Sequence, residues 1–266
     1  MNDLHLSTSS GNLSLEYEWI DGPEAAPLLV FLHEGLGSVT MWRDWPRRLC
    51  EAGRFRGLMY SRPGYGGSTP RLRDEKWPVD YLHAQALEVL PAFLDALDID
   101  TEHAPPWLIG HSDGASIALI HAAAFPTRVA GLVAMAPHVF VEDVSIHGIE
   151  RARDAYVSTD TRGSSLAVKL ARYHRDPDSA FWGWNDIWLD PAFRSWNIEN
   201  LLSAITAPVL VVQGEDDEYG TMAQVDRIAQ QVPHAHLLKL AQCGHVPHRD
   251  QSGRVTDAII GFIGQH

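Results

Sequence analysis

The chain has 266 residues, 45% of them hydrophobic and 21% charged, and a formal net charge of −13. This length suits one large domain, or one domain with an insertion, and an acidic surface argues against nucleic-acid or membrane partners. The chain has no apolar run near the ~20 residues of a membrane span and no signal peptide at its N-terminus. It contains only two cysteines, Cys50 and Cys243, so we expect a reduced, cytoplasmic protein.

Strands and helices are predicted to alternate along the chain. Alternating polarity over Leu13–Ile20 predicts an edge strand with one face open to solvent. Short apolar runs predict strands buried on both faces of a sheet at Leu28–His33, Gly57–Tyr60, Trp107–His111, Gly131–Ala136, Pro208–Gln213 and His236–Leu240. Helical spacing predicts helices over Met41–Glu51, Tyr81–Leu97, Ala115–Ala124, Thr221–Gln231 and Ser252–Ile263. The pattern indicates an α/β fold, with a mostly parallel central sheet and helices on both faces.

The alternation is interrupted once, between residues 139 and 205. This segment has no clear strand and reads as several short helices with apolar residues of their own. We therefore predict an inserted helical cap over 139–205 and a core formed by 1–138 and 206–266. The cap brings Trp182, Trp184 and Trp188 close together in the sequence. They either line a pocket or pack the cap onto the core.

A serine lies between two glycines where a predicted strand becomes a predicted helix. The stretch "GHSDG" places Ser112 between Gly110 and Gly114. Such a strand-to-helix turn can expose a serine hydroxyl, and the following helix directs partial positive charge at a developing anion. The pattern predicts a nucleophilic Ser112.

A serine nucleophile needs a base, and the base needs an orienting carboxylate. The segment "GEDDEYG", after the strand at Pro208–Gln213, offers Asp216 and Asp217, of which we prefer Asp217. The segment "GHVPH", after the last strand, offers His245 and His248. We prefer His245, because Gly244 permits a loop that turns it toward the serine.

Five segments in this order resemble the α/β-hydrolase superfamily: "FLHEGLGS", "YSRPGYGGS", "GHSDG", "GEDD" and "GHVPH". The likeness is greatest to small capped esterases, lactonases and proline-iminopeptidase-like serine hydrolases. It implies a triad of Ser112, Asp217 and His245, and an oxyanion hole whose first donor is the Asp113 N–H. The second donor is expected from the loop after His33. Glu34 stands where the family usually has glycine, which leaves Gly35, our preferred donor, and Glu34 as alternatives.

Two carboxylates, Glu34 and Asp113, therefore lie beside the predicted site. A buried carboxylate requires a partner. One interpretation is recognition of a substrate amine, since aminoacyl-ester hydrolases of this superfamily resemble the chain in using a Ser-Asp-Gly elbow. The other is internal pairing, with Arg62 as partner of Glu34 and with His111 or a backbone N–H as partner of Asp113. His111 is a further candidate for the pocket lining.

The predicted activity is hydrolysis of a small carboxylic ester, lactone or thioester through an acyl-enzyme. Three alternatives remain: an aminoacyl ester or amide hydrolase, a carbon–carbon bond hydrolase, and a ligand sensor with slow turnover. No metal-ligand spacing and no dinucleotide-binding fingerprint follow from the sequence, so neither a metal nor a cofactor is expected. The expected partner is a small-molecule substrate. The sequence does not indicate an oligomeric state.

Overall fold

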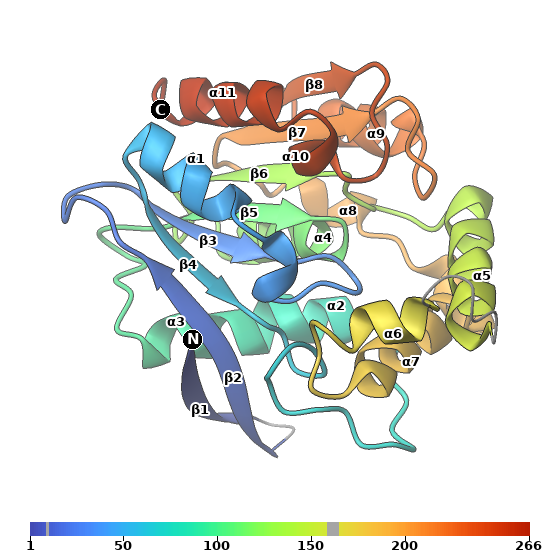
Figure 1. Ribbon diagram of the computed structural model, residues 1–266. Coiled ribbons are helices and arrows are strands. Elements are labelled where there is room, and N and C mark those ends of the chain that lie inside the picture. Colours follow the sequence, from blue (N-terminus) through green and yellow to red (C-terminus); the bar gives the residue numbers. More distant parts are fainter. Residues whose placement is uncertain (9–10, 159–164) are drawn as a thin grey trace.

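The computed structural model describes residues 1–8, 11–158 and 165–266. In these ranges eight strands form one sheet, in the order β1-β2-β4-β3-β5-β6-β7-β8. Strands β1 (Asn2–Thr8) and β2 (Gly11–Ile20) are antiparallel to their neighbours. The others run parallel: β3 (Leu28–Leu32), β4 (Arg56–Tyr60), β5 (Trp107–His111), β6 (Gly131–Met135), β7 (Val209–Gly214) and β8 (His236–Leu240). This confirms the predicted α/β fold (Figure 1).

Both edges of the sheet differ from the prediction. β2 is not the edge strand, because β1 pairs along its outer side with Leu4 opposite Leu15 and Leu6 opposite Leu13. β8, predicted to be buried on both faces, forms the other edge and exposes Leu237. Its apolar residues mark a strand correctly, but a run of this kind carries no signal for the position of the strand in the sheet.

Helices cover both faces of the sheet. One face packs on α1 (Trp45–Gly53) and α11 (Ser252–Ile263), which contact each other. The predicted helix Met41–Glu51 is divided, because Arg43 adopts a φ of 57° and ends the short turn η1 (Thr40–Trp42). The other face packs on α2 (Tyr81–Ala84), η2 (Gln85–Val89), α3 (Leu90–Ala96), α4 (Asp113–Ala124), α8 (Glu199–Leu202) and α9 (Met222–Gln231).

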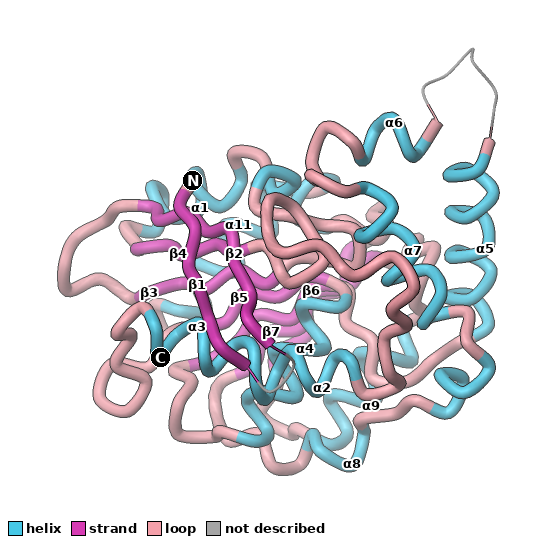
Figure 2. The backbone as a smooth tube through the Cα atoms, turned by 90° about the horizontal axis from the view of Figure 1, so that it is seen from below, coloured by secondary structure: helices cyan, strands magenta, loops and turns pink. Residues whose placement is uncertain are grey.

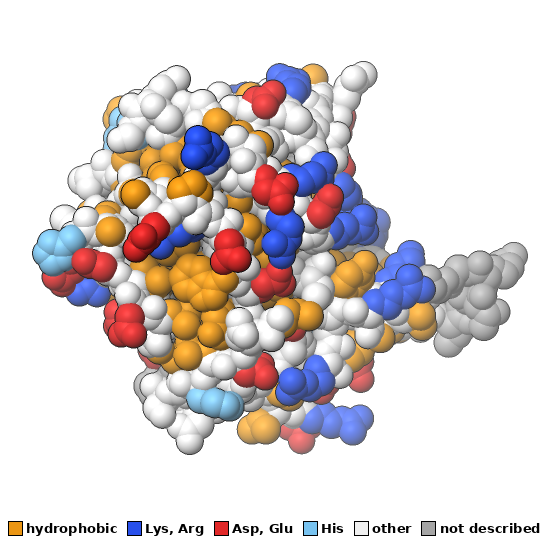
Figure 3. Space-filling model, turned by 60° about the vertical axis from the view of Figure 1, so that its left-hand side comes forward, with side chains coloured by type: hydrophobic (Ala, Val, Ile, Leu, Met, Phe, Trp, Pro, Cys, Tyr) orange, Lys and Arg blue, Asp and Glu red, His pale blue; other side chains and the backbone are white. Residues whose placement is uncertain are grey.

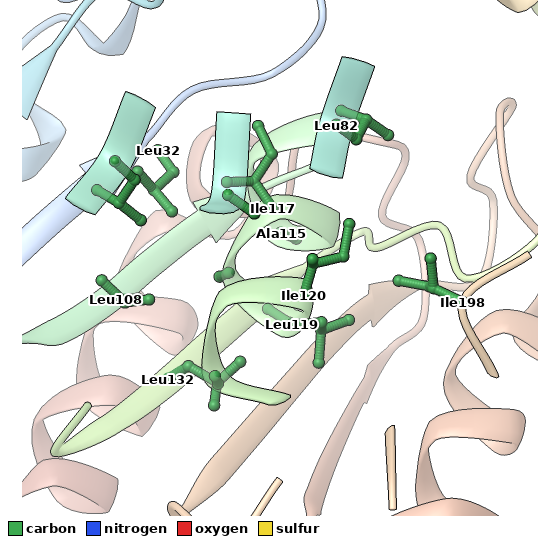
Figure 4. Packing of buried hydrophobic residues seen from close by; sticks show 14 of the residues in the cluster. Leu32, Leu82, Leu108, Ala115, Ile117, Leu119, Ile120, Leu132 and Ile198 are labelled. Atoms are coloured by element: carbon green, nitrogen blue, oxygen red, sulfur yellow. The ribbon is translucent and has the colours of Figure 1, made fainter. Parts of the chain in front are cut away.

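Helix α4 lies at the centre of the second face. Figure 4 shows its side chains Ile117, Leu119 and Ile120 among residues of the strands and of α2. Every residue from Asp113 to Ala122 is buried. A helix that is buried on all sides is held in place by its surroundings, so its first turn is a rigid platform for the residue before it.

Helices α5 (Asp143–Val157), α6 (Leu166–Leu170) and α7 (Pro177–Trp188), and the turn η3 (Pro191–Ser195), follow β6 and precede β7. Figures 1 and 2 both place α5, α6 and α7 together beyond the carboxyl ends of the parallel strands. Helix α8 belongs to the segment 139–205 that was predicted as cap, but it packs on α4 and α9 of the core. The short α10 (Pro247–Asp250) precedes α11.

Acidic and basic side chains are interspersed on the face of the molecule that Figure 3 shows. None of the helices built by the described residues combines the length and the apolar character that a bilayer span requires. Within those residues, no group of three or more potential ligand side chains is arranged to hold a metal ion.

Candidate active site

Ser112 occupies a strained turn between β5 and α4. Its φ of 53° and ψ of −119° are unusual for a residue with a side chain. The flanking glycines permit this turn: a Cβ on Gly110 would overlap the carbonyl oxygen of Gly114, and a Cβ on Gly114 would overlap that of Leu32 in β3. Strand, helix and neighbouring strand therefore approach closely only because both positions lack a side chain.

Ser112, His245 and Asp217 come together at the carboxyl edge of the sheet. Nε2 of His245 lies 2.9 Å from Oγ of Ser112, and its Nδ1 lies 2.9 Å from each carboxylate oxygen of Asp217. A carboxylate only accepts, so Nδ1 carries the proton and Nε2 is free to accept one from the serine. The carboxylate of Asp217, with a side chain 1% exposed, also accepts from the backbone N–H groups of Tyr219 and Gly220.

The pKa of His245 is shifted in the direction that strengthens a base. Burial alone lowers this pKa, but the hydrogen bond to Asp217 and the charge of Asp217 raise it above the ordinary value. Of the two other candidates, Asp216 is exposed to solvent. His248 packs against Trp42 and Trp45, with ring centroids 4.9 and 4.8 Å away, and lies outside this arrangement.

The loop after β3 is fixed by hydrogen bonds to the carbonyl oxygen of Glu34. The carbonyl oxygen of Glu34 accepts from His33 Nδ1 at 2.7 Å, from an Arg62 guanidinium nitrogen at 2.8 Å and from the Gly37 N–H at 3.0 Å. The C=O and N–H of one trans peptide point in opposite directions, so the Gly35 N–H points away from these donors. Gly35 lines the same cavity as Ser112. The Asp113 N–H, in the first turn of α4, has no acceptor within the helix.

The two unusual acids are paired internally, but the predicted partners were wrong. Asp113 is fully buried and accepts from the Tyr81 hydroxyl at 2.8 Å, with an Arg62 guanidinium nitrogen 3.6 Å away. Glu34 pairs with His111 at 2.6 Å. At Glu34, Arg62 donates to the backbone carbonyl oxygen and not to the predicted partner, the carboxylate. The sequence placed the four groups in one region but could not say which side chains face each other.

A cavity of about 320 Å³ opens over Ser112. Trp184 and Trp188 of α7 line it, together with Glu34, His111 and Asp113. Trp182 does not: it packs edge-on against Phe181 and Tyr156. Trp184 and Trp188 are four residues apart and share a helix face, whereas Trp182, two residues from Trp184, points elsewhere. The lining also holds polar and aromatic side chains that are not among the predicted site residues: His138, Ser145, Glu218, Tyr219 and Arg249.

The place of His138 at the end of a predicted strand indicates a role in packing or in the polarity of the pocket. His138 follows β6, and residues after parallel strands gather at one edge of the sheet. It is 3% exposed, its ring lies 5.8 Å from that of His245, and burial lowers its pKa to about 3, so it is uncharged at neutral pH. Ser145 and Tyr219 carry no comparable signal, because their place depends on how α5 and the loop after β7 fold.

The comparisons with known proteins agree with this fold. A family model described as "Alpha/beta hydrolase family" matches residues 29–258. The chain is 26% identical to the 2-hydroxy-6-oxononadienedioate/2-hydroxy-6-oxononatrienedioate hydrolase 1 of Dechloromonas aromatica, over 95% of this chain and 92% of that protein. It is 24% identical to a 2-hydroxy-6-oxo-6-phenylhexa-2,4-dienoate hydrolase of Burkholderia cepacia, over 86% and 85% of the two chains.

Solved structures of esterases and lactonases share the architecture. An esterase from Thermogutta terrifontis superimposes with a TM-score of 0.75 at 18% identity, covering 100% of this chain and 99% of that one. The enol-lactonase from Burkholderia xenovorans LB400 gives 0.72 at 18% identity, covering 98% and 100%. At such identities the likeness concerns the fold alone.

Proposed function

Because this chain belongs to the alpha/beta hydrolase family, we propose that it is a serine hydrolase that cleaves small carboxylic esters through an acyl-enzyme on Ser112. One observation carries the proposal: Oγ of Ser112, on its strained turn, lies 2.9 Å from Nε2 of His245, whose other nitrogen faces Asp217. This is the arrangement that activates a serine hydroxyl.

In the proposed reaction His245 takes the Ser112 proton as Oγ attacks the ester carbonyl. The N–H groups of Asp113 and Gly35 stabilise the oxyanion, and loss of one such donor typically costs ~10²–10³ in rate. His245 then gives its proton to the departing alcohol oxygen. A water molecule, deprotonated by His245, attacks the acyl-enzyme and releases the carboxylic acid. Asp217 orients His245 and stabilises its charged form.

The cavity supports a small substrate without a charged amine. We propose that α5, α6 and α7 act as the cap, and that Trp184 and Trp188 form an apolar wall for the acyl or alcohol group. Glu34 and Asp113 already have the partners His111, Arg62 and Tyr81. This pairing favours a neutral ester over the amine-bearing substrate of an aminoacyl hydrolase.

A second candidate is cleavage of a carbon–carbon bond. It is favoured by the relatives named as dienedioate and phenylhexadienoate hydrolases, which align along most of the chain. The same triad would serve, but such an enzyme would turn over dienoic substrates and leave simple esters nearly untouched.

A paired assay tests the proposal. One chromogenic ester carries a short neutral acyl group, its partner carries an α-amino group on the same acyl chain, and the Ser112→Ala protein is the blank. We expect faster cleavage of the neutral ester, and no cleavage above background by Ser112→Ala. Preference for the amino ester would contradict the substrate class. Absence of serine-dependent turnover would favour the carbon–carbon hydrolase, tested with a dienoic substrate, or the slow ligand sensor.

A further inference from the structure

The side chain of His111 joins three loops that the proposed mechanism uses. His111 ends β5, directly before Ser112, and its side chain is 0% exposed. Its Nδ1 lies 2.6 Å from Oε2 of Glu34, in the loop after β3. Its Nε2 lies 2.7 Å from the backbone carbonyl oxygen of His245, in the loop after β8. The His111 ring thus connects three segments: the turn at Ser112, the loop after β3 that carries Glu34 and Gly35 (the proposed oxyanion loop), and the loop after β8 that carries His245.

Both partners of this ring accept hydrogen bonds. A carbonyl oxygen can only accept, so Nε2 of His111 donates to His245. Burial alone would raise the pKa of Glu34, but the charge of His111 and the hydrogen bond from it lower that pKa to about 2. The carboxylate of Glu34 is therefore the acceptor that faces Nδ1, and the His111 ring joins it to the backbone of His245.

Glu34 is the side-chain partner of the buried His111 ring. Within the described ranges, no other carboxylate lies within ion-pair distance of His111. The rings packed against His111 are Trp42, His245 and His248. Burial and the nearby charge of His111 lower the pKa of His248 well below its usual value, so it stays neutral. Since a buried polar group requires a hydrogen-bond partner, loss of the Glu34 carboxylate would leave Nδ1 of His111 unpaired.

The backbone of His245 is anchored from both sides. Its N–H donates to Oε2 of Glu218 at 3.2 Å, and its C=O accepts from His111. The contact with His111, at 2.7 Å, is the shorter of the two, and its donor is a fully buried side chain. It therefore restrains where the His245 ring stands relative to Ser112.

We infer that the Glu34–His111 contact is a positioning device for the proposed base. Glu34 holds His111, and His111 holds the backbone of His245 so that its ring stays opposite Ser112. The inference rests on the proposed function, because it serves the same triad. It also gives a reason, other than recognition of a substrate amine, for an acid in the oxyanion loop.

The hydrogen bonds of the His111 ring can be tested without an activity assay. Nitrogen NMR of the protein labelled with ¹⁵N-histidine distinguishes a ring protonated on both nitrogens from a neutral ring, and the His111 signals are those missing from His111→Phe. We expect Nε2 of His111 to keep its proton in the wild type and in Glu34→Gln, and the Nδ1 signal to shift when the carboxylate partner is replaced. An Nδ1 signal that is the same in the wild type, Glu34→Gln and Glu34→Leu would overturn the inference.

Kinetics with the neutral ester test the positioning role. In Glu34→Leu the ring loses its partner, and we expect kcat to fall about 10- to 100-fold with KM changed less than about threefold. In Glu34→Gln the amide can donate to Nδ1 while neutral His111 still donates from Nε2, so kcat should stay within about threefold of wild type.

Three kinetic results decide the matter. A wild-type kcat in Glu34→Leu would contradict the positioning role. A change in KM alone would also contradict it, because that result would assign Glu34 to substrate binding. Equal losses in Glu34→Gln and Glu34→Leu would show that the carboxylate acts otherwise than by holding His111. If the wild type hydrolyses no ester, the proposed function fails, while the NMR result still decides whether Glu34 holds His111.

Discussion

At the scale of single residues, the clearest contrast lies between neighbours Asp216 and Asp217. Asp217→Asn keeps the shape of the side chain, but its amide can donate to Nδ1 of His245, which places the ring proton on Nε2. That nitrogen can then no longer accept the proton of Ser112, and we expect kcat to fall about 10³- to 10⁴-fold. Asp216 is exposed, so Asp216→Asn should change kcat less than about threefold. The reverse pattern would overturn the assignment of the acid.

The same substitution carries a pH signature. His245 acts as base only when neutral, so kcat/KM should fall as the pH drops through its pKa, which Asp217 raises. Removing that carboxylate removes the raising influence. The residual kcat/KM of Asp217→Asn should therefore begin to fall at a lower pH than that of the wild type. If both proteins lose activity at the same acid pH, Asp217 does not act on the pKa of His245.

Residue types and chain order were sufficient to predict the three groups that meet at the carboxyl edge. Each of Ser112, Asp217 and His245 follows a strand, and parallel strands deliver such residues to one edge. The pairings of Glu34 and Asp113 were not predictable in the same way. They depend on which way side chains point across the space between three loops, and no periodicity in the sequence records that.

At the scale of elements, Gly114 shows how tightly the turn is built. A Cβ there would overlap the carbonyl oxygen of Leu32, which belongs to the rigid sheet. We expect Gly114→Ala to lower the free energy of unfolding by about 2–4 kcal/mol in urea titrations. The matched control is Gly261→Ala in α11, where a Cβ meets nothing within 4 Å. It should raise stability by about 0.5–1 kcal/mol, and equal effects of both changes would contradict the steric account.

The elements themselves were predicted wherever a local pattern determined them. Apolar runs located β3 to β7, because a strand covered on both faces needs apolar residues at nearly every position. A similar run located β8, although this strand is an exposed edge. β1 was missed, since Leu4 and Leu6 are its only apolar residues. The division of the helix at Arg43 was also missed, because a positive φ at an arginine comes from tertiary packing and not from residue preference.

At the scale of the whole molecule, the segment between β6 and β7 meets the core at Gly35. A Cβ on this residue would overlap the indole of Trp184 in α7, so the oxyanion loop and the proposed cap are in direct contact. This contact joins residues far apart in the sequence and was outside the reach of local patterns. It implies that the cap influences the geometry of the proposed oxyanion hole as well as the shape of the cavity.

A double-mutant cycle tests this coupling. Gly35→Ala should push against the indole and displace the Gly35 N–H, lowering kcat/KM about 10- to 100-fold. Trp184→Ala frees the space that the new methyl group needs, so the double variant should recover part of that loss, with a coupling energy of about 1–3 kcal/mol. Trp182→Ala is the control, because Trp182 lies in the same helix but outside the cavity. Combined with Gly35→Ala it should show additive effects. Additive behaviour with Trp184→Ala as well would mean that the cap and the oxyanion loop act independently.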